Sequence, residues 1–134
     1  MSAIYPKCKE AWLGAGTRID LDADDIRVLL VESTYTYSAA HQYVSDLGTN
    51  DNGRSAALGT KTITNGVFGA ADTSLTATAA LACNAIIAYK YNAADAAAEL
   101  IAYIDSGTGL PFTPGAGQTV NIVFDTGANK IFAL

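Results

Sequence analysis

The feature that most constrains the fold is a series of short apolar segments separated by turn-forming residues. Residues 26–31, 83–91 and 119–124 are rich in β-branched or aromatic side chains and have the length of strands. Gly, Asn, Asp and Pro residues separate them from further strand-like segments at 60–64, 67–68, 75–80, 100–104 and 130–134. About eight short strands at this spacing are typical of antiparallel proteins. The sequence therefore predicts a mostly β domain, either an antiparallel β-sandwich or a barrel-like arrangement.

Three of these segments carry more specific expectations. Residues 26–31 present apolar side chains on both faces, so we expect this strand in the middle of the core. Asn65-Gly66 is a strong hairpin signal between 60–64 and its return strand, with Ile63 facing inward. Ile19 and Leu21 alternate with aspartates, which predicts the start of another strand.

Two short helices are expected beside the strands. Residues 4–13 form an amphipathic pattern in which Pro6 fits the first turn, and Gly14 and Gly16 end the helix. Residues 38–47 predict a second helix, whose inward-facing side chains are Tyr43, Val44 and Leu47. We expect residues 1–134 to form a single domain, because a chain of this length buries enough surface to fold without a disulfide or metal.

The charge pattern excludes two classes of partner. The formal net charge is −5 and the basic residues are scattered, so the stripe of Lys and Arg typical of nucleic-acid binding is missing. The same acidic balance argues against an anionic membrane surface. Only 16% of the residues are charged, below the ~25% usual for soluble domains, which indicates that part of the surface is covered by another molecule.

The cellular setting is predicted from the cysteines and the N-terminus. Cys8 and Cys83 give no disulfide framework, and we expect two reduced, buried thiols, although one bridge between them is possible. The first residues lack the apolar centre of a signal peptide, and no apolar run reaches the ~18 residues of a membrane span. These features predict a soluble protein of a reducing cytosol, or one that is assembled there.

The strongest catalytic motif is the sequence Asp-Thr-Gly at Asp125, which follows an apolar strand as in aspartic proteases. A second motif, Asp-Ser-Gly, stands at Asp105. The chemistry needs two carboxylates that share one proton, yet these two are too close in sequence to belong to separate lobes. A homodimeric protease needs more chain after its single aspartate than the nine residues that follow Asp125. We interpret both motifs as turns, in which Asp caps and Gly takes a positive φ.

The metal and cofactor motifs are equally incomplete. Asp20, Asp22 and Asp24 match the first ligands of a calcium loop, but Asp25 stands where Gly is needed and Val31 where Glu is needed. A solvated acidic turn is the expected structure. Because His41 is the only histidine, a three-His site is impossible, and Gly14-Ala-Gly16 lacks the rest of a dinucleotide loop. We therefore expect no catalytic, cofactor-binding or metal-binding residues, and a protein that is not an enzyme.

An ordered set of segments resembles one protein family. The first segment is residues 19–31, Ile-Asp-Leu-Asp-Ala-Asp-Asp-Ile-Arg-Val-Leu-Leu-Val, and it is followed by Thr34-Tyr35-Thr36. Next come a patch at 40–46 and a Gly/Thr-rich hairpin at 59–63. Residues 83–91 and the sequence Leu-Ile-Ala-Tyr-Ile-Asp-Ser-Gly at 100–107 follow, and the chain closes with residues 120–127 and 131–134. In composition and order, these segments resemble small virion proteins of tailed bacteriophages.

The resemblance implies a β-sandwich-like structural protein, most often a capsid decoration (cement) protein. Such a protein would bind the major capsid protein on the outer surface of the assembled shell as a homo-oligomer, on virions assembled in the host cytoplasm. A tail component (tube, collar or tail-decorating subunit) is the first alternative. A carbohydrate-binding or adhesion module is the second. The resemblance also places a strand at 100–105, where helix propensity favours a helix through Leu100 and we expect only a turn or single helical turn near 93–97.

Exposed loops and aromatic residues supply the candidate contact residues. Seven tyrosines are present; Tyr35 alternates in phase with Tyr37, and Tyr89 with Tyr91, as on a strand face, which suits either an interface or the edge of a core. The candidates come from the N-terminal segment, the 35–58 region and the 107–117 loop: Ile4, Tyr5, Trp12, Tyr35, Tyr37, Tyr43, Leu110 and Phe112.

Overall fold

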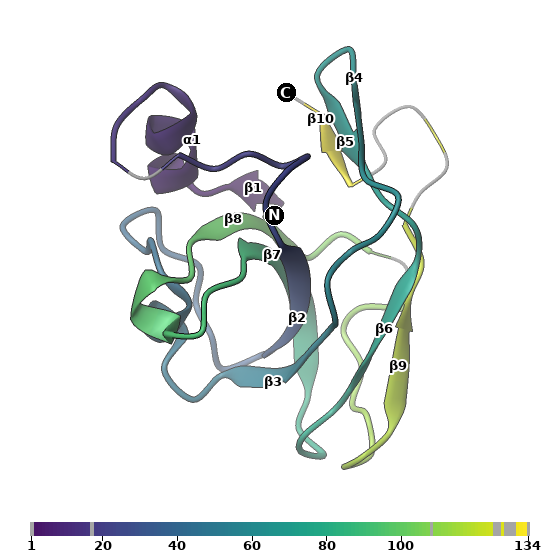
Figure 1. Cartoon of the computed structure of the whole chain (residues 1–134). Helices are drawn as coiled ribbons and strands as arrows, with labels where there is room; N and C mark the ends of the chain where they lie inside the picture. Colours follow the sequence, from purple (N-terminus) through teal and green to yellow (C-terminus); the bar gives the residue numbers. More distant parts are fainter. Residues whose placement is uncertain (1, 17, 108, 125–126, 128–130, 134) are drawn as a thin grey trace.

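The computed structural model in Figure 1 describes residues 2–16, 18–107, 109–124, 127 and 131–133. Its largest unit is a five-stranded antiparallel sheet in the order β1–β8–β7–β2–β3. The strands span Ala3–Ile4 (β1), Leu100–Ile104 (β8), Cys83–Lys90 (β7), Ile26–Glu32 (β2) and Asp51–Arg54 (β3). The prediction of a mostly β, antiparallel fold is confirmed.

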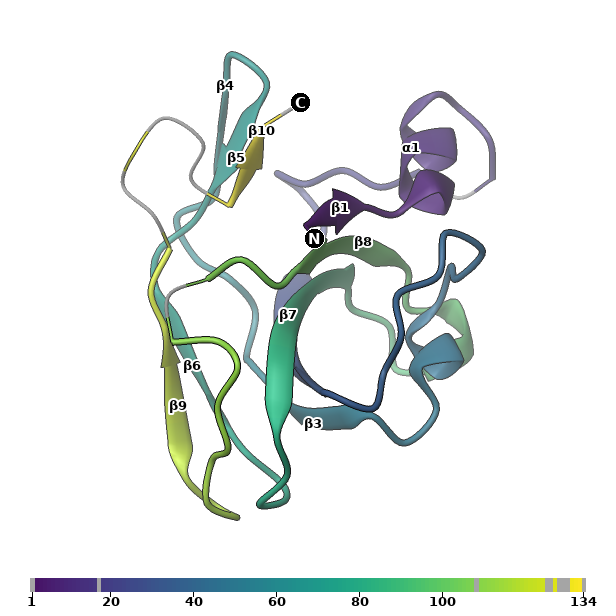
Figure 2. The ribbon, with the colours of Figure 1, turned by 180° about the vertical axis from the view of Figure 1, so that it is seen from behind.

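Two smaller antiparallel sheets complete a β-sandwich-like domain. One has the order β10–β5–β4 and the other pairs β6 with β9. Their strands span Thr62–Thr64 (β4), Val67–Gly69 (β5), Thr73–Thr76 (β6), Thr119–Ile122 (β9) and Phe132–Ala133 (β10). Figures 1 and 2 show the β6–β9 ribbon standing beside the curled five-stranded sheet, which it meets at an isolated bridge between Ser55 and Leu75.

The centre of the core is the pair formed by β2 and β7. Val28, Leu29, Leu30 and Val31 are all fully buried, and β7 pairs with β2 along its whole length. Side chains from both faces of these strands are removed from water, which is why the apolar pattern has no polar face. The expected position of residues 26–31 in the middle of the core is confirmed.

The Asn65-Gly66 hairpin forms as expected, but Ile63 does not face inward. Asn65 has φ 53° and Gly66 has φ 77°, as a two-residue turn with both central residues at positive φ requires. Ile63 pairs with the buried Phe68 yet remains 50% exposed. The inward prediction is wrong because β4 is the outer edge strand of its sheet and no further layer covers it among the described residues.

The N-terminal helix is shorter than predicted. Helix α1 spans Pro6–Trp12, with Pro6 in the first turn, and Gly14 and Gly16 follow it at positive φ. The chain before it pairs with β8 as β1, so Ile4 belongs to a strand and not to the helix. Backbone groups there are satisfied by the edge of the sheet, which competes with helix initiation.

The second helix is largely absent. Only a 3₁₀ helix, η1 (Val44–Leu47), forms within residues 38–47. The Asp46 carboxylate accepts hydrogen bonds from the backbone N–H groups of Gln42 and Tyr43, which fixes the start of the helix at Val44. The inward positions of Val44 and Leu47 are confirmed, whereas Tyr43 is half-buried.

Two further local predictions have opposite outcomes. Residues 95–97 form a single 3₁₀ turn, η2 (Asp95–Ala97), and β8 follows it, as expected. Residues 19–22 do not begin a strand. The Asp20 carboxylate accepts the N–H groups of Asp22 and Ala23 and folds the segment into a turn.

Candidate interaction surface

A cluster of tyrosines fills the space between the N-terminal segment and the loop after β2. Tyr5 packs on Tyr37 at 5.1 Å between ring centroids, and Tyr103 packs on both Tyr35 and Tyr37. The Tyr5 hydroxyl lies 2.9 Å from the Tyr35 hydroxyl, which lies 2.8 Å from His41 Nδ1. The three polar groups form one hydrogen-bonded chain inside an aromatic core.

This cluster removes two of the predicted contact residues from the surface. Tyr5 is 0% exposed and Tyr35 is 5% exposed, so neither side chain offers area to a partner of the folded chain. Burial raises the pKa of both phenols, which therefore stay neutral and act as hydrogen-bonding groups. The contact assignments of Tyr5 and Tyr35 are wrong because their rings pack on Tyr37 and Tyr103 inside the cluster.

A carbohydrate-binding module would need an open aromatic platform, for which Tyr35 and Tyr37 are the candidates in the sequence, and the same burial removes it. Tyr35 and Tyr37 lie outside any strand, and Tyr35 is covered. Tyr89 is also buried in the core, and the half-exposed Tyr91 is stacked under the Arg27 guanidinium, whose carbon lies 3.8 Å from the ring centroid. Neither tyrosine pair presents two open ring faces.

The acidic segment at 20–25 forms a turn in which Asp20, Asp24 and Asp25 accept hydrogen bonds from nearby groups. The Asp24 carboxylate accepts the Asp20 N–H and lies 3.2 Å from Lys90 Nζ. Two hydrogen bonds from the Arg27 guanidinium to Asp25 hold the pKa of that carboxyl below its usual range. The described residues contain no group of three His, Cys, Asp or Glu side chains placed to bind a metal ion.

The structure places the two cysteines and one of the two Asp-(Ser/Thr)-Gly motifs. Cys8 and Cys83 are both free and buried, as predicted, and burial raises the pKa of the Cys8 thiol to about 12. The backbone N–H of Asp105, just beyond β8, donates to Ser2 Oγ at 3.3 Å. Asp125 and Thr126 lie outside the described residues, so the Asp-Thr-Gly turn is not placed.

A mostly apolar cleft, which we call the β9 cleft, opens on one side of the five-stranded sheet. It has a volume of about 1390 Å³ and lies between the five-stranded sheet and the strands β9 and β10. One wall comes from the sheet: Ile4, Leu30, Ile86, Ala102 and Ile104. The other comes from the 109–112 loop and the C-terminal strands, chiefly Leu110, Phe112, Val120, Ile122, Val123 and Phe132.

The lining of the β9 cleft is mostly apolar, with a smaller polar part. Its lining includes the polar side chains of Ser2, Tyr103, Ser106 and Asn121, and no charged side chain lines it among the described residues. Two glycines, Gly107 and Gly109, border it. A surface of this kind favours uncharged, apolar groups, because a charge placed there would lose water without gaining an opposite charge.

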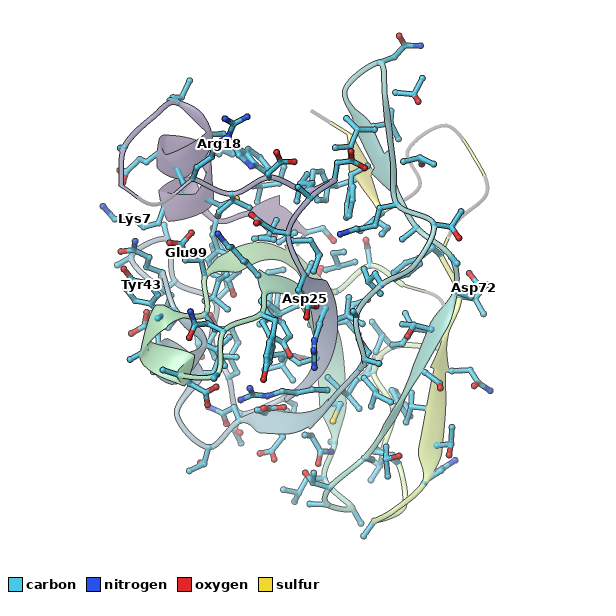
Figure 3. The ribbon with its side chains drawn as sticks, viewed as in Figure 1. Lys7, Arg18, Asp25, Tyr43, Asp72 and Glu99 are labelled. Atoms are coloured by element: carbon cyan, nitrogen blue, oxygen red, sulfur yellow. The ribbon has the colours of Figure 1, made fainter. Side chains whose placement is uncertain are left out.

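The cleft brings together three of the predicted contact residues. Ile4, Leu110 and Phe112 line it directly, although 100 or more positions separate Ile4 from the other two. Trp12 reaches its border through Phe132, at 6.0 Å between ring centroids. Tyr37 lies half-buried on the tyrosine cluster instead. Tyr43 pairs with Glu99 and lies on the opposite side of the molecule from Asp72, as Figure 3 shows.

Sequence reasoning missed the β9 residues of this surface. Val120 and Ile122 alternate with Thr119 and Asn121, so the pattern predicts a strand with one apolar face. The pattern does not tell whether that face is fully covered. Only the placement of β9 across the cleft from β7 and β8 leaves Val120 half-buried and the following Val123 73% exposed.

Comparisons with protein families, with curated proteins and with solved structures find no match to this chain. Among the described residues, no helix is long and apolar enough to cross a membrane.

Proposed function

We propose that this chain is a capsid decoration protein, which binds the major capsid protein on the outer surface of an assembled bacteriophage shell. The observation that carries the proposal is the ordered resemblance of its segments, over nearly the whole chain, to small virion proteins of tailed phages. The β-sandwich-like fold and the strand at Leu100–Ile104 agree with what the resemblance implies. On this proposal the protein acts through contacts, as one of many copies on the virion.

The physical basis is selective binding to the assembled shell. A protein that binds only the assembled state stabilises that state by mass action. Apolar area removed from water contributes about 25 cal/mol per Å², so a contact of modest size on each subunit is enough when many copies act together. The β9 cleft supports the proposal because it is a mostly apolar surface, with no charged side chain among its described residues, on a domain of net charge −5.

The first experiment is co-sedimentation of the purified protein with expanded phage shells, followed by thermal melting of the shells. We expect saturable binding and a higher shell melting temperature when the protein is bound. Binding to tails and not to heads would replace the proposal with the tail alternative. Absence of binding to both would refute it.

A matched pair of variants locates the contact. Val123→Asp places a charge in the β9 cleft, whereas Ile63→Asp places one on β4, outside it. Both positions are exposed, so both variants should keep the fold. We expect Val123→Asp to weaken shell binding and Ile63→Asp to leave it near that of the wild type.

A further inference from the structure

Strand β9 has a backbone edge that is not paired within the described part of the chain. Its ladder with β6 runs from Thr76–Thr119 to Thr73–Ile122. Beyond that ladder, Thr119, Val120, Asn121 and Ile122 make no backbone hydrogen bond to another described residue. An unpaired edge of this kind can accept an additional strand.

The register tells which residues face the open side. The Ala77 N–H donates to the Gln118 carbonyl at 2.9 Å, so Ala77 and Gln118 form a hydrogen-bonded pair at this end of the ribbon. Hydrogen-bonded pairs alternate along an antiparallel ladder, which directs the backbone groups of Val120 and Ile122 toward β6. The backbone groups of Thr119 and Asn121 then point away from β6, and both residues are exposed.

The opposite wall of the cleft offers apolar contacts instead of a second backbone edge. The N–H and carbonyl of Phe112 are both occupied by Cys83, at 2.9 and 2.8 Å. Leu110 and Phe112 still line the cleft with their side chains. An occupant would therefore gain backbone hydrogen bonds on the β9 side and apolar contacts from Leu110, Phe112 and the sheet.

These features define what fits. An extended segment of about four residues spans roughly 13 Å, which matches the length of β9. The cleft has no charged side chain among its described residues, and Gly107 and Gly109 border it with no side chains of their own. An ammonium, a carboxylate or a phosphate would find no opposite charge there. A lipid chain would leave the β9 edge unpaired.

We propose that the β9 cleft binds an extended, uncharged segment of a partner polypeptide, which adds to β9 as an antiparallel or parallel strand. This is the β-augmentation mode of recognition, in which the backbone provides affinity and alternate side chains provide specificity. The inference rests on the proposed function only for the identity of the partner, which would be the major capsid protein. The chemistry of the segment follows from the cleft.

The test uses the whole protein and a blocked hexapeptide of alternating Thr and Val, monitored by amide chemical shifts. We expect saturable shifts at Thr119 and Asn121. The same peptide with N-methyl groups on alternate residues should bind about tenfold more weakly, because it lacks the N–H donors. A version with Asp in place of Val should also bind about tenfold more weakly, because the described lining of the cleft contains no cation.

Protein variants give an independent readout. Asn121→Pro removes the outward N–H and should weaken peptide binding about tenfold, whereas Asn121→Ala keeps the N–H, removes only the side-chain amide and should weaken binding much less. The amide pattern of β6 reports whether the ribbon stays folded in Asn121→Pro. If that variant disrupts the ribbon, the N-methyl peptide tests the same hydrogen bonds on the unaltered protein.

Several results would overturn the inference. These are no shift with any of the peptides, equal binding of the N-methyl peptide, and shifts produced by decanol but not by the hexapeptide. Concentration-dependent shifts of β9 without added peptide would show that a second copy occupies the edge, which also contradicts the inference.

Shell binding separates this inference from the proposed function. If the wild type binds the hexapeptide but not the shells, only the proposed function fails. If the shells bind Asn121→Pro as tightly as the wild type, the β9 edge is not the shell contact and the inference fails while the proposed function stands.

Discussion

Pairing and burial differ sharply between the two long strands, β2 and β7, and the short strand β9. β7 has eight residues and is paired on both sides, by β2 and β8, whereas β9 has four residues and, within the described part of the chain, pairs with β6 alone. The side chains of Ile87 and Ala88 are fully buried, while Thr119 and Asn121 are exposed. The first region holds the fold together, and the second leaves backbone and apolar surface exposed, where we propose that a partner binds.

The difference follows from how many neighbours each strand has. A strand between two others satisfies its backbone on both edges and buries both faces, so substitutions there remove contacts that nothing else replaces. An edge strand has free donors and acceptors and tolerates substitution. Stability and recognition are therefore expected to respond to different substitutions, which the following predictions test.

The largest effect is expected in β7. Ile87→Ala removes a fully buried side chain and should lower the free energy of unfolding by about 2–5 kcal/mol. Val123→Ala, next to β9, should change it by less than about 0.5 kcal/mol because that side chain is 73% exposed. Urea denaturation measures both. Equal losses would show that the two regions contribute alike to stability.

The next largest loss of stability is expected at the contact between β3 and the loop that joins β6 to β7. Asn52, fully buried in β3, accepts hydrogen bonds from Thr78 Oγ1 and the Ala79 N–H and donates to the Ala79 carbonyl, which fixes the loop between β6 and β7. Asn52→Ala leaves these groups unpaired and should cost about 1–3 kcal/mol. It should also speed hydrogen exchange in β6 more than in β8.

The control for this prediction is Asn121→Ala, which removes an exposed amide from β9. We expect it to leave the free energy of unfolding within about 0.5 kcal/mol of the wild type. Unchanged exchange in β6 of Asn52→Ala would mean that the ribbon is held by other contacts.

The tyrosine cluster should give a loss of similar or smaller size. Tyr35→Phe removes the hydroxyl that joins Tyr5 to His41 and leaves the fully buried Tyr5 hydroxyl without its partner. We expect Tyr35→Phe to lower the free energy of unfolding by about 1–3 kcal/mol. Tyr5→Phe should lower it by about 1 kcal/mol, because the Tyr35 hydroxyl then keeps His41 as its partner. Thermal or urea unfolding distinguishes the two, and a larger loss for Tyr5→Phe would contradict the proposed chain of hydrogen bonds.

The smallest effect is expected at an ion pair on the surface. The Arg54 guanidinium donates two hydrogen bonds of 2.9 Å to Asp95, which holds the pKa of that carboxyl below its usual range. A lowered pKa stabilises the folded state above the unfolded pKa of about 3.9, and this contribution is lost as the pH falls through the folded value. Both side chains are partly exposed, so Asp95→Asn should cost less than about 1 kcal/mol at pH 7.

The pH dependence provides the check. The difference between Asp95→Asn and the wild type should disappear at low pH, where the wild-type carboxyl is protonated. Asp22→Asn makes the same change in charge at an exposed position and should show no comparable loss. A difference that persists below the folded pKa would indicate a packing effect.

The strands and turns with local signals could be predicted from the sequence. The apolar runs at 26–31 and 83–91 and the Asn65-Gly66 turn depend on neighbours within a few residues, and all three form. Helix 38–47 could not be predicted correctly, because the Asp46 side chain competes for the backbone N–H groups of Gln42 and Tyr43. Such competition depends on the geometry of the turn and not on composition.

The candidate surface was predicted only in part, since exposure is a tertiary property. Ile4, Leu110 and Phe112 line the β9 cleft, whereas Tyr5 is buried. The sequence around an aromatic residue such as Tyr5 does not distinguish a core position from an interface position. The sequence by itself determined the β class, the hairpin and the reduced cysteines, because these depend on local propensity and composition. The tertiary structure decided which strand kept a free edge and which tyrosines were buried, because strand order and burial depend on residues far apart in the chain.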